Sequence, residues 1–160
     1  MTNVAQPPED VRWKLGELYS GPEDPAIEED LARADAMAKQ FAEKYRGKVA
    51  SLSPEGVAGA LREQEELLTS GYKPAGYASL FFAAQTQDPA GQRLLSRVRE
   101  ATTKIFNQLV FFDVELKTAP QEPDDRFLSA PELANYRPHL EQLRVFASNT
   151  RPEPEERLLP

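Results

Sequence analysis

The chain has 160 residues, of which 40% are hydrophobic and 28% are charged, and its formal net charge is −7 at pH 7. This length and composition are typical of one globular domain with a substantial core. The negative charge argues against nucleic acid and anionic membrane surfaces as partners, because both would repel it. With no cysteine, the chain has no disulfide, thiolate nucleophile or cysteine metal ligand, which is compatible with the reducing cytoplasm.

The first residues of the chain do not have the pattern of a signal peptide. Residues 1–12 are polar and contain prolines, so we expect a disordered lead rather than a signal peptide. The apolar run at 80–84 is far too short to span a bilayer. We therefore expect a disordered lead over 1–12 and a helical domain over 13–148. Residues 149–160 would be a linker and the truncated start of a further domain.

The first predicted helix begins at Asp24 and Pro25, a good N-cap followed by a proline in the first helical position. Apolar residues then recur in steps of three or four up to Gly47, a natural helix end. These residues are Ile27, Leu31, Ala34, Ala38, Phe41 and Tyr45.

The sequence over residues 53–86 predicts two helices. Ser53 and Pro54 predict the start of one that ends at Ser70 and Gly71. Pro74 then predicts a separate, compact helix reaching residue 86. Because its sequence is nearly all apolar, we expect this short helix to be the most buried element.

Residues 89–116 predict the longest helix, around which the others pack. Asp88 caps it, and no proline or glycine occurs after Gly91. Its length would be about 42 Å at about 1.5 Å per residue, so it needs several partners along its surface. Its stripe consists of Leu94, Val98, Ala101, Ile105, Leu109, Phe112 and Leu116.

The C-terminal part predicts a loop over 118–126 and then a helix opened by Ser129 and Pro131, interrupted at Pro138. A last helix start follows at 154–156, with glutamates in its first turn and no helix body after it. No strand pattern competes. The predicted class is therefore all-α: a bundle of about five to six helices around one long central helix, with more than half the residues helical.

The residues offer no metal site of a usual kind. His139 is the single histidine, and we interpret it as a solvated or structurally bonded side chain rather than a ligand. Glu122, Asp124 and Asp125 lack the ligand spacing and turn glycine of a calcium loop, so we interpret them as a solvated loop. We predict no metal-binding residue.

Catalytic and binding residues are equally hard to find. Glu63, Glu65 and Glu66 are interpreted as solvated carboxylates on an exposed helix face. Tyr72 and Lys73 beside a glycine could mark a partner-binding loop, although an ordinary interhelical turn is favoured. No serine nucleophile motif or phosphate loop is present. We predict no catalytic and no cofactor-binding residue, and the substrate-binding residues stay unknown.

Several short motifs occur in an order that resembles the N-terminal domain of the oligoendopeptidase F family of zinc metallopeptidases. The resemblance runs from about Trp13 to Leu159, and its strength lies in the order and spacing of loose motifs. The motifs are Trp13, Leu15, Leu18 and Tyr19 before Asp24-Pro25; Tyr45-Arg46-Gly47-Lys48; Tyr77-Ala78-Ser79-Leu80 with Thr86-Gln87-Asp88; Phe111-Phe112 before Glu115-Leu116; Leu133 to Tyr136-Arg137 and Arg144; and Pro154-Glu155-Glu156-Arg157-Leu158-Leu159.

The resemblance implies a domain that packs over a zinc-dependent catalytic domain and walls a channel admitting short, unfolded peptides. The family's zinc motif, His-Glu-x-x-His, and its downstream glutamate match no position here, so no functional residue carries over. The expected cofactor is none in this chain, with zinc in the absent catalytic domain. The expected partners are that domain and, in the full enzyme, an oligopeptide. Such a chain would be an expressed fragment, a truncated reading frame or a lone copy of the domain.

Two functions remain open at this point. The first is a substrate-access and scaffold domain with no peptidase activity of its own. The alternative is a free-standing helical interaction module that binds another helix in a groove. If the chain is the scaffold domain, the apolar face left by the absent catalytic domain would favour a weak homodimer.

Overall fold

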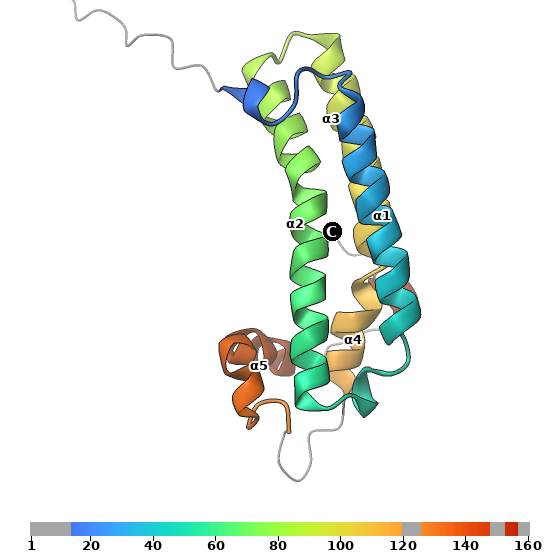
Figure 1. The fold of residues 1–160 in the computed structure, drawn as a ribbon, viewed down its shortest axis with the longest axis vertical. Helices are drawn as coiled ribbons and strands as arrows, with labels where there is room; N and C mark the ends of the chain where they lie inside the picture. The colour runs from blue at the N-terminus through green and yellow to red at the C-terminus, as the bar shows by residue number, and fades with distance from the viewer. Residues whose placement is uncertain (1–13, 120–125, 148–152, 157–160) are drawn as a thin grey trace, which may run out of the picture.

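The computed structural model describes residues 14–119, 126–147 and 153–156, and within these ranges the chain is helical with no strand. Three long helices lie side by side, α1 (Pro25–Tyr45), α2 (Pro54–Ala84) and α3 (Pro89–Asn107) (Figure 1). Two shorter helices, α4 (Val110–Thr118) and α5 (Arg137–Val145), lie near one end of this bundle. The remaining elements are η1 (Leu15–Glu17), η2 (Val49–Ser51), η3 (Pro131–Tyr136) and α6 (Glu153–Glu156). The predicted all-α class is confirmed.

Each long helix begins with an N-cap side chain followed by a proline at the first helical position. Asp24 accepts a hydrogen bond from the Ala26 amide at 2.9 Å, and Asp88 accepts one from the Ala90 amide at 2.8 Å. Ser53 does the same for Gly56 at 3.2 Å. These side chains satisfy amides that no helical carbonyl can reach, so all three predicted starts are confirmed.

The prediction of two helices over 53–86 is wrong, because α2 runs without interruption through Gly71 and Pro74. A Cβ on Gly71 would lie 3.0 Å from the Phe106 ring, so this glycine gives α3 room to approach rather than ending the helix. Pro74 is buried within the helix, where tertiary packing outweighs its missing amide. At about 1.5 Å per residue, its 31 residues make α2 about 46 Å long.

The prediction of one continuous helix over 89–116 is also wrong. The segment divides into α3 and α4 at Gln108 and Leu109, whose amides bond to carbonyls three residues back, as in a tight 3₁₀ turn. The central helix is α2 instead, since it contacts α1, α3, η3 and η1. The bundle therefore has one long central helix, as predicted, but a different segment supplies it.

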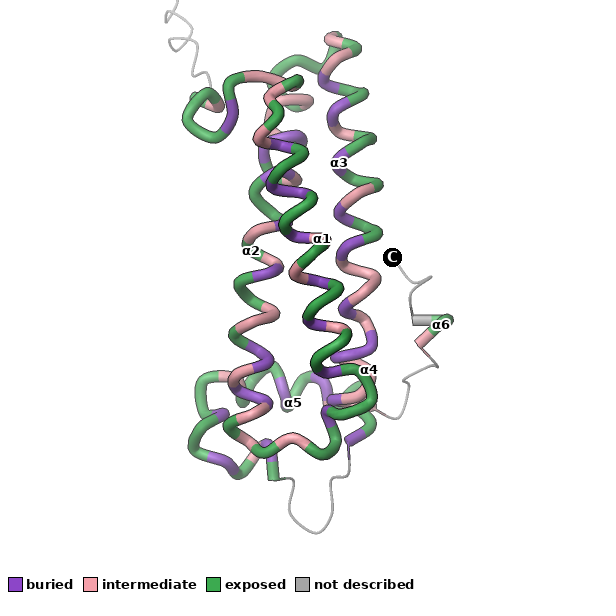
Figure 2. The backbone as a smooth tube through the Cα atoms, turned by 45° about the vertical axis from the view of Figure 1, so that its right-hand side comes forward, coloured by how far each residue is buried: buried purple, intermediate pink, exposed green. Residues whose placement is uncertain are grey.

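The buried residues form one core along the inner faces of α1, α2 and α3 (Figure 2). The stripe predicted for α1 is buried throughout. An aromatic cluster of Phe41, Tyr45, Phe111 and Phe112 joins α1 to α4, with ring centroids 4.8–6.3 Å apart. The segment around Phe81 was expected to be the most buried, but this ring and its neighbours Leu80 and Phe82 are only half-buried, because they lie at the end of the bundle.

The interruption predicted at Pro138 is confirmed. The chain forms the 3₁₀ helix η3 up to Tyr136 and then α5, with Pro138 in its first turn. Leu133 and Leu140 are buried beneath them. The predicted lead over 1–12 lies outside the described residues, as do most of the 118–126 loop and most of the C-terminal segment over 149–160.

Candidate functional site

Arg46, the residue after α1, joins three parts of the chain. Its guanidinium lies 2.5 Å from a carboxylate oxygen of Glu153 in α6 and stacks over the Phe111 ring at 4.2 Å from the centroid. It also donates to the Gln108 carbonyl at 3.4 Å, where α3 gives way to α4. A planar guanidinium can bind a carboxylate and stack on an aromatic ring at the same time. We call the region around Arg46, Phe111, Glu115 and Glu153 the Arg46 junction.

Glu115 of α4 holds the chain that leaves α1. Its carboxylate accepts hydrogen bonds from the backbone amides of Gly47 at 2.7 Å and Val49 at 3.2 Å. Gly47 has φ of +74°, a left-handed conformation that glycine adopts without strain. The helix end predicted at Gly47 is confirmed, and its turn is fixed to α4 by an acidic side chain 68 residues away.

An arginine side chain fixes the C-terminal end of α4. Arg144 of α5 donates to the carbonyls of Leu116, Lys117 and Ala119, the latter two at 3.1 and 3.4 Å. The last carbonyls of a helix lack helical partners and carry partial negative charge, which a cation stabilises. Arg126 similarly donates to the carbonyl of Ala50 in η2. Segments distant in sequence are thus tied together around α4.

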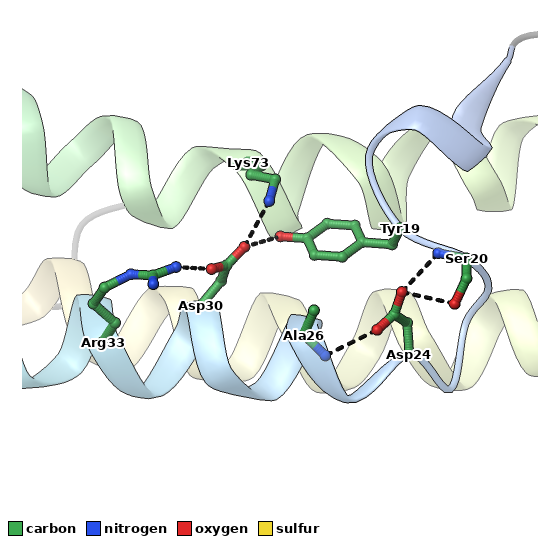
Figure 3. A network of polar contacts seen from close by, with 7 residues as sticks. All are labelled: Tyr19, Ser20, Asp24, Ala26, Asp30, Arg33 and Lys73. Atoms are coloured by element: carbon green, nitrogen blue, oxygen red, sulfur yellow. Dashed lines mark hydrogen bonds and ion pairs between the residues drawn. The ribbon is translucent and has the colours of Figure 1, made fainter.

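A second polar cluster surrounds Asp30 in the first half of α1 (Figure 3). Asp30 of α1 is buried, and its carboxylate accepts hydrogen bonds from the Tyr19 hydroxyl at 2.6 Å and from Lys73 of α2 at 2.9 Å, with Arg33 pairing to its other oxygen. Both oxygens are therefore satisfied, as a buried carboxylate requires. Burial raises the pKa of Tyr19. This arrangement joins the segment after η1 to α1 and α2, and the bonds of Asp30 leave it no free oxygen for chemistry.

A third feature is an open groove on α2, which is lined in part by a carboxylate that lacks one hydrogen-bond partner within the described part of the chain. Asp113 of α4 has one carboxylate oxygen, Oδ1, that is shielded from solvent and has no hydrogen-bond partner among the described residues. Burial raises the pKa of Asp113, while the charges of His139 and Lys117 and the Gln64 amide lower it by smaller amounts. Such a group costs folding free energy unless something binds it.

The residues weighed from the sequence fall in several different places. His139 is exposed on the rim of this groove, as expected for a solvated histidine. Glu66 is exposed, but Glu63 accepts hydrogen bonds from Lys44 and Tyr45, so it is paired rather than simply solvated. Glu65 likewise accepts the Tyr136 hydroxyl at 2.9 Å.

The partner-binding loop and the interhelical turn considered at Tyr72 and Lys73 are both wrong, because the two residues lie inside α2. Lys73 binds Asp30, while Tyr72 is exposed and stacks on Phe106 with centroids 5.1 Å apart. The acidic residues Glu122, Asp124 and Asp125 lie outside the described residues.

The sequence analysis missed Asp30 and Asp113, although both had a detectable signal. Asp30 falls three residues after Ile27 and four before Ala34, so it lies on the apolar stripe of its helix. Asp113 falls four residues after Leu109 and three before Leu116, so it also lies on an apolar stripe. An acidic residue on an apolar stripe predicts a buried carboxylate, whose partners then have to be found.

The family resemblance implies a zinc ion in the catalytic domain and none in this chain. Among the described residues, no three histidine, cysteine, aspartate or glutamate side chains lie close enough to hold a metal ion. Nor does any helix of the described ranges combine the length and hydropathy needed to cross a membrane.

Comparison with known proteins gives one match. Residues 115–160 match the family model Peptidase_M3_N, described as Oligopeptidase F. Searches of curated proteins and of solved structures returned no match. The matched stretch begins at Glu115 of the Arg46 junction and includes Arg144 and Glu153, so it covers one side of the junction contacts. This match falls within the C-terminal part of the resemblance that the sequence motifs predicted from about Trp13 to Leu159.

Proposed function

We propose that this chain is the substrate-access and scaffold domain of an oligopeptide-cleaving zinc metallopeptidase of the oligopeptidase F type. The catalytic zinc domain is its expected partner, and the cytoplasm its expected location. The sequence contains no His-Glu-x-x-His motif, so hydrolysis would depend on that partner. The family match over residues 115–160 supports the assignment to this class of enzyme.

The Arg46 junction is the observation that carries the proposal. In the family resemblance, the segment around Glu153 leads toward the catalytic part, and here Arg46 holds that segment against the end of α1 and α4. A contact that fixes the start of this segment sets the direction in which a following domain would lie. The junction would therefore orient the two domains and keep the access channel at a constant width.

A domain-replacement experiment tests this role. We would fuse the chain to the catalytic domain of an oligopeptidase F that lacks its own N-terminal domain, and measure hydrolysis of quenched peptides of increasing length. The expected result is cleavage of short peptides, exclusion of folded proteins, and no hydrolysis by the chain alone. Fusion that leaves the length preference of the bare catalytic domain unchanged would contradict the proposal.

Arg46→Ala in the same fusion tests the junction itself. We expect a weaker length preference, because the interdomain direction would no longer be fixed. Lys39→Ala is the matched control, since it removes an ion pair with Asp35 that lies within α1. Equal effects of the two substitutions would show that the junction does not position the domains.

The groove on α2 favours the second candidate function, a free-standing helical interaction module. The coding sequence downstream of this chain separates the two functions. A metallopeptidase region there, in or out of frame, supports the scaffold domain, whereas an isolated gene supports the module.

A further inference from the structure

The open groove lies along one face of α2. It consists of two adjoining hollows of about 260 and 520 Å³ that share Gln64 and Leu68 as lining residues. Residues from α3, the α3–α4 turn and α4 form one wall, and residues from η3 and α5 form the other. We call this feature the α2 groove, and its remaining lining residues are Leu61, Glu65, Tyr72, Phe106, Leu109, Val110, Asp113, Asn135, Tyr136, Pro138 and His139.

Apolar and aromatic side chains dominate the α2 groove. Leu61 and Leu109 are buried at its base, and Leu68 and Phe106 are half-buried. Tyr72 stacks on Phe106 at one end, yet 58% of it remains exposed. Exposed aromatic side chains beside an apolar depression are typical of protein-binding surfaces.

The polar lining of the groove includes two acidic side chains. These are Asp113 and Glu65. Lys117, whose charge acts on Asp113, is one helical turn further along α4 and is not a lining residue. The shielded Oδ1 of Asp113 can accept a hydrogen bond that no described residue supplies. A cationic donor carried between apolar groups would complement this surface.

The shape of the α2 groove indicates the form of the ligand. Its lining residues on α2 extend from Leu61 to Tyr72, which is about 16 Å at about 1.5 Å per residue. This length accommodates about three turns of a helix, and helices flank it on both sides. Leu61, Leu68 and Tyr72 are seven and four residues apart, so they lie along one face of α2. A bound helix with apolar anchors three and four residues apart could lie along this face.

We propose that the α2 groove binds an amphipathic helix of another polypeptide, and that an arginine or lysine of this helix forms an ion pair with Asp113. Its apolar residues would pack on Leu68, Phe106 and Leu109. This proposal does not depend on the scaffold role, because the Arg46 junction and the α2 groove have no residue in common.

The test uses a panel of blocked, alanine-based helical peptides. Each carries one central arginine, with leucine, isoleucine or phenylalanine varied at the neighbouring positions of the same face. A second panel has glutamine in place of arginine. Binding to the whole chain is measured by calorimetry and by backbone amide shifts in NMR spectra.

We expect the best arginine peptide to bind about tenfold or more tightly than its glutamine counterpart, because a desolvated ion pair is lost in the latter. Asp113→Asn should remove this difference, since it keeps the shape and abolishes the charge. Glu66→Gln is the control, because it removes the same charge from an exposed α2 position outside the groove. The amide shifts should centre on α2 and α4.

Three outcomes would overturn the proposal. The first is no binding by any arginine peptide, and the second is equal binding of the arginine and glutamine panels. The third is self-association of the chain that Tyr72→Ala abolishes, which would assign the groove to a second copy. In each case, circular dichroism of Asp113→Asn and Tyr72→Ala would verify that the variants are folded.

Discussion

Arg46 after α1 forms an ion pair with Glu153 of α6, although the two residues are 107 positions apart in the sequence. Both side chains are partly shielded, with 39% and 26% of their surfaces exposed, and the guanidinium also stacks on Phe111. The contact fixes the end of the first long helix to the segment that, in the family resemblance, leads to the catalytic part.

Arg46→Ala should release α6 while leaving the bundle folded. The global loss of stability should be under about 1 kcal/mol, because partly exposed ion pairs contribute little. The local effect should be larger, since α6 has only four residues and the ion pair holds the first of them. Amide hydrogen exchange of the C-terminal peptide should accelerate in Arg46→Ala and not in Lys39→Ala. Unchanged exchange would mean that other contacts hold α6.

Glu115→Ala should destabilise the whole domain by about 1–3 kcal/mol, because hydrogen bonds to a charged group are stronger than neutral ones. The substitution leaves the amides of Gly47 and Val49 without their acceptor at the turn after α1. Urea unfolding monitored by circular dichroism measures the loss. Glu132→Ala, on the exposed first turn of η3, is a suitable control and should change the stability far less. Equal midpoints for the two variants would rule out this capping role.

Two glycines of α2 should respond in opposite ways to alanine. Gly76 is exposed and has no atom within 4 Å of a built Cβ, so Gly76→Ala should stabilise the domain by about 0.5–1 kcal/mol through helix propensity. In Gly71→Ala the new methyl group would lie 3.0 Å from the Phe106 ring, which would have to move. The propensity gain should then be cancelled or reversed. Thermal unfolding of the two variants provides the comparison, and equal stabilisation would show that Phe106 yields freely.

These glycines also show where the sequence was informative and where it was not. Helix starts depend on neighbouring residues, so Asp24, Ser53 and Asp88 were correctly recognised from the chain alone. Gly71 and Pro74 were interpreted as a helix end and a new start, because local propensity says nothing about Phe106 packing against the glycine. The helix continues there since long-range burial outweighs the local cost.

The turn between α3 and α4 is the opposite case. No glycine or proline occurs there, and the residues favour a helix, yet the chain tightens at Gln108 and Leu109. Gln108 donates to Asp35 of α1 at 2.8 Å, and Leu109 is buried. Both interactions are tertiary, so no local pattern predicts them. The α2 groove depends on this turn, which is why the sequence could place Asp113 on a helix but could not give its surroundings.

Weak self-association is a further expectation. Among the described residues, four large apolar side chains are exposed, and Val145 and Phe146 are adjacent at the end of α5, with 71% and 52% of their surfaces exposed. Apolar surface of this kind favours a concentration-dependent dimer. Sedimentation velocity should show the dimer weakened in Val145→Ser, while Tyr72→Ala should leave it intact. A strict monomer at high concentration, together with no binding of a hydrophobic dye, would contradict this expectation.

The last prediction concerns Asp113 and pH. Burial raises the pKa of this carboxyl above its ordinary value of 3.8, so between 3.8 and the raised value the folded protein holds more protons than the unfolded chain. The free energy of unfolding must therefore fall as the pH rises through that interval, and the loss persists at neutral pH. Asp113→Asn cannot ionise, so it should gain stability relative to the parent chain as the pH increases, with no further gain above the raised pKa. Urea unfolding at a series of pH values measures the difference, with Glu66→Gln as the reference for loss of an exposed charge. If Asp113→Asn instead destabilises the domain equally at every pH, the Asp113 carboxylate already has its hydrogen-bond partners in the folded chain. The α2 groove would then offer no unpaired carboxylate to a cationic ligand.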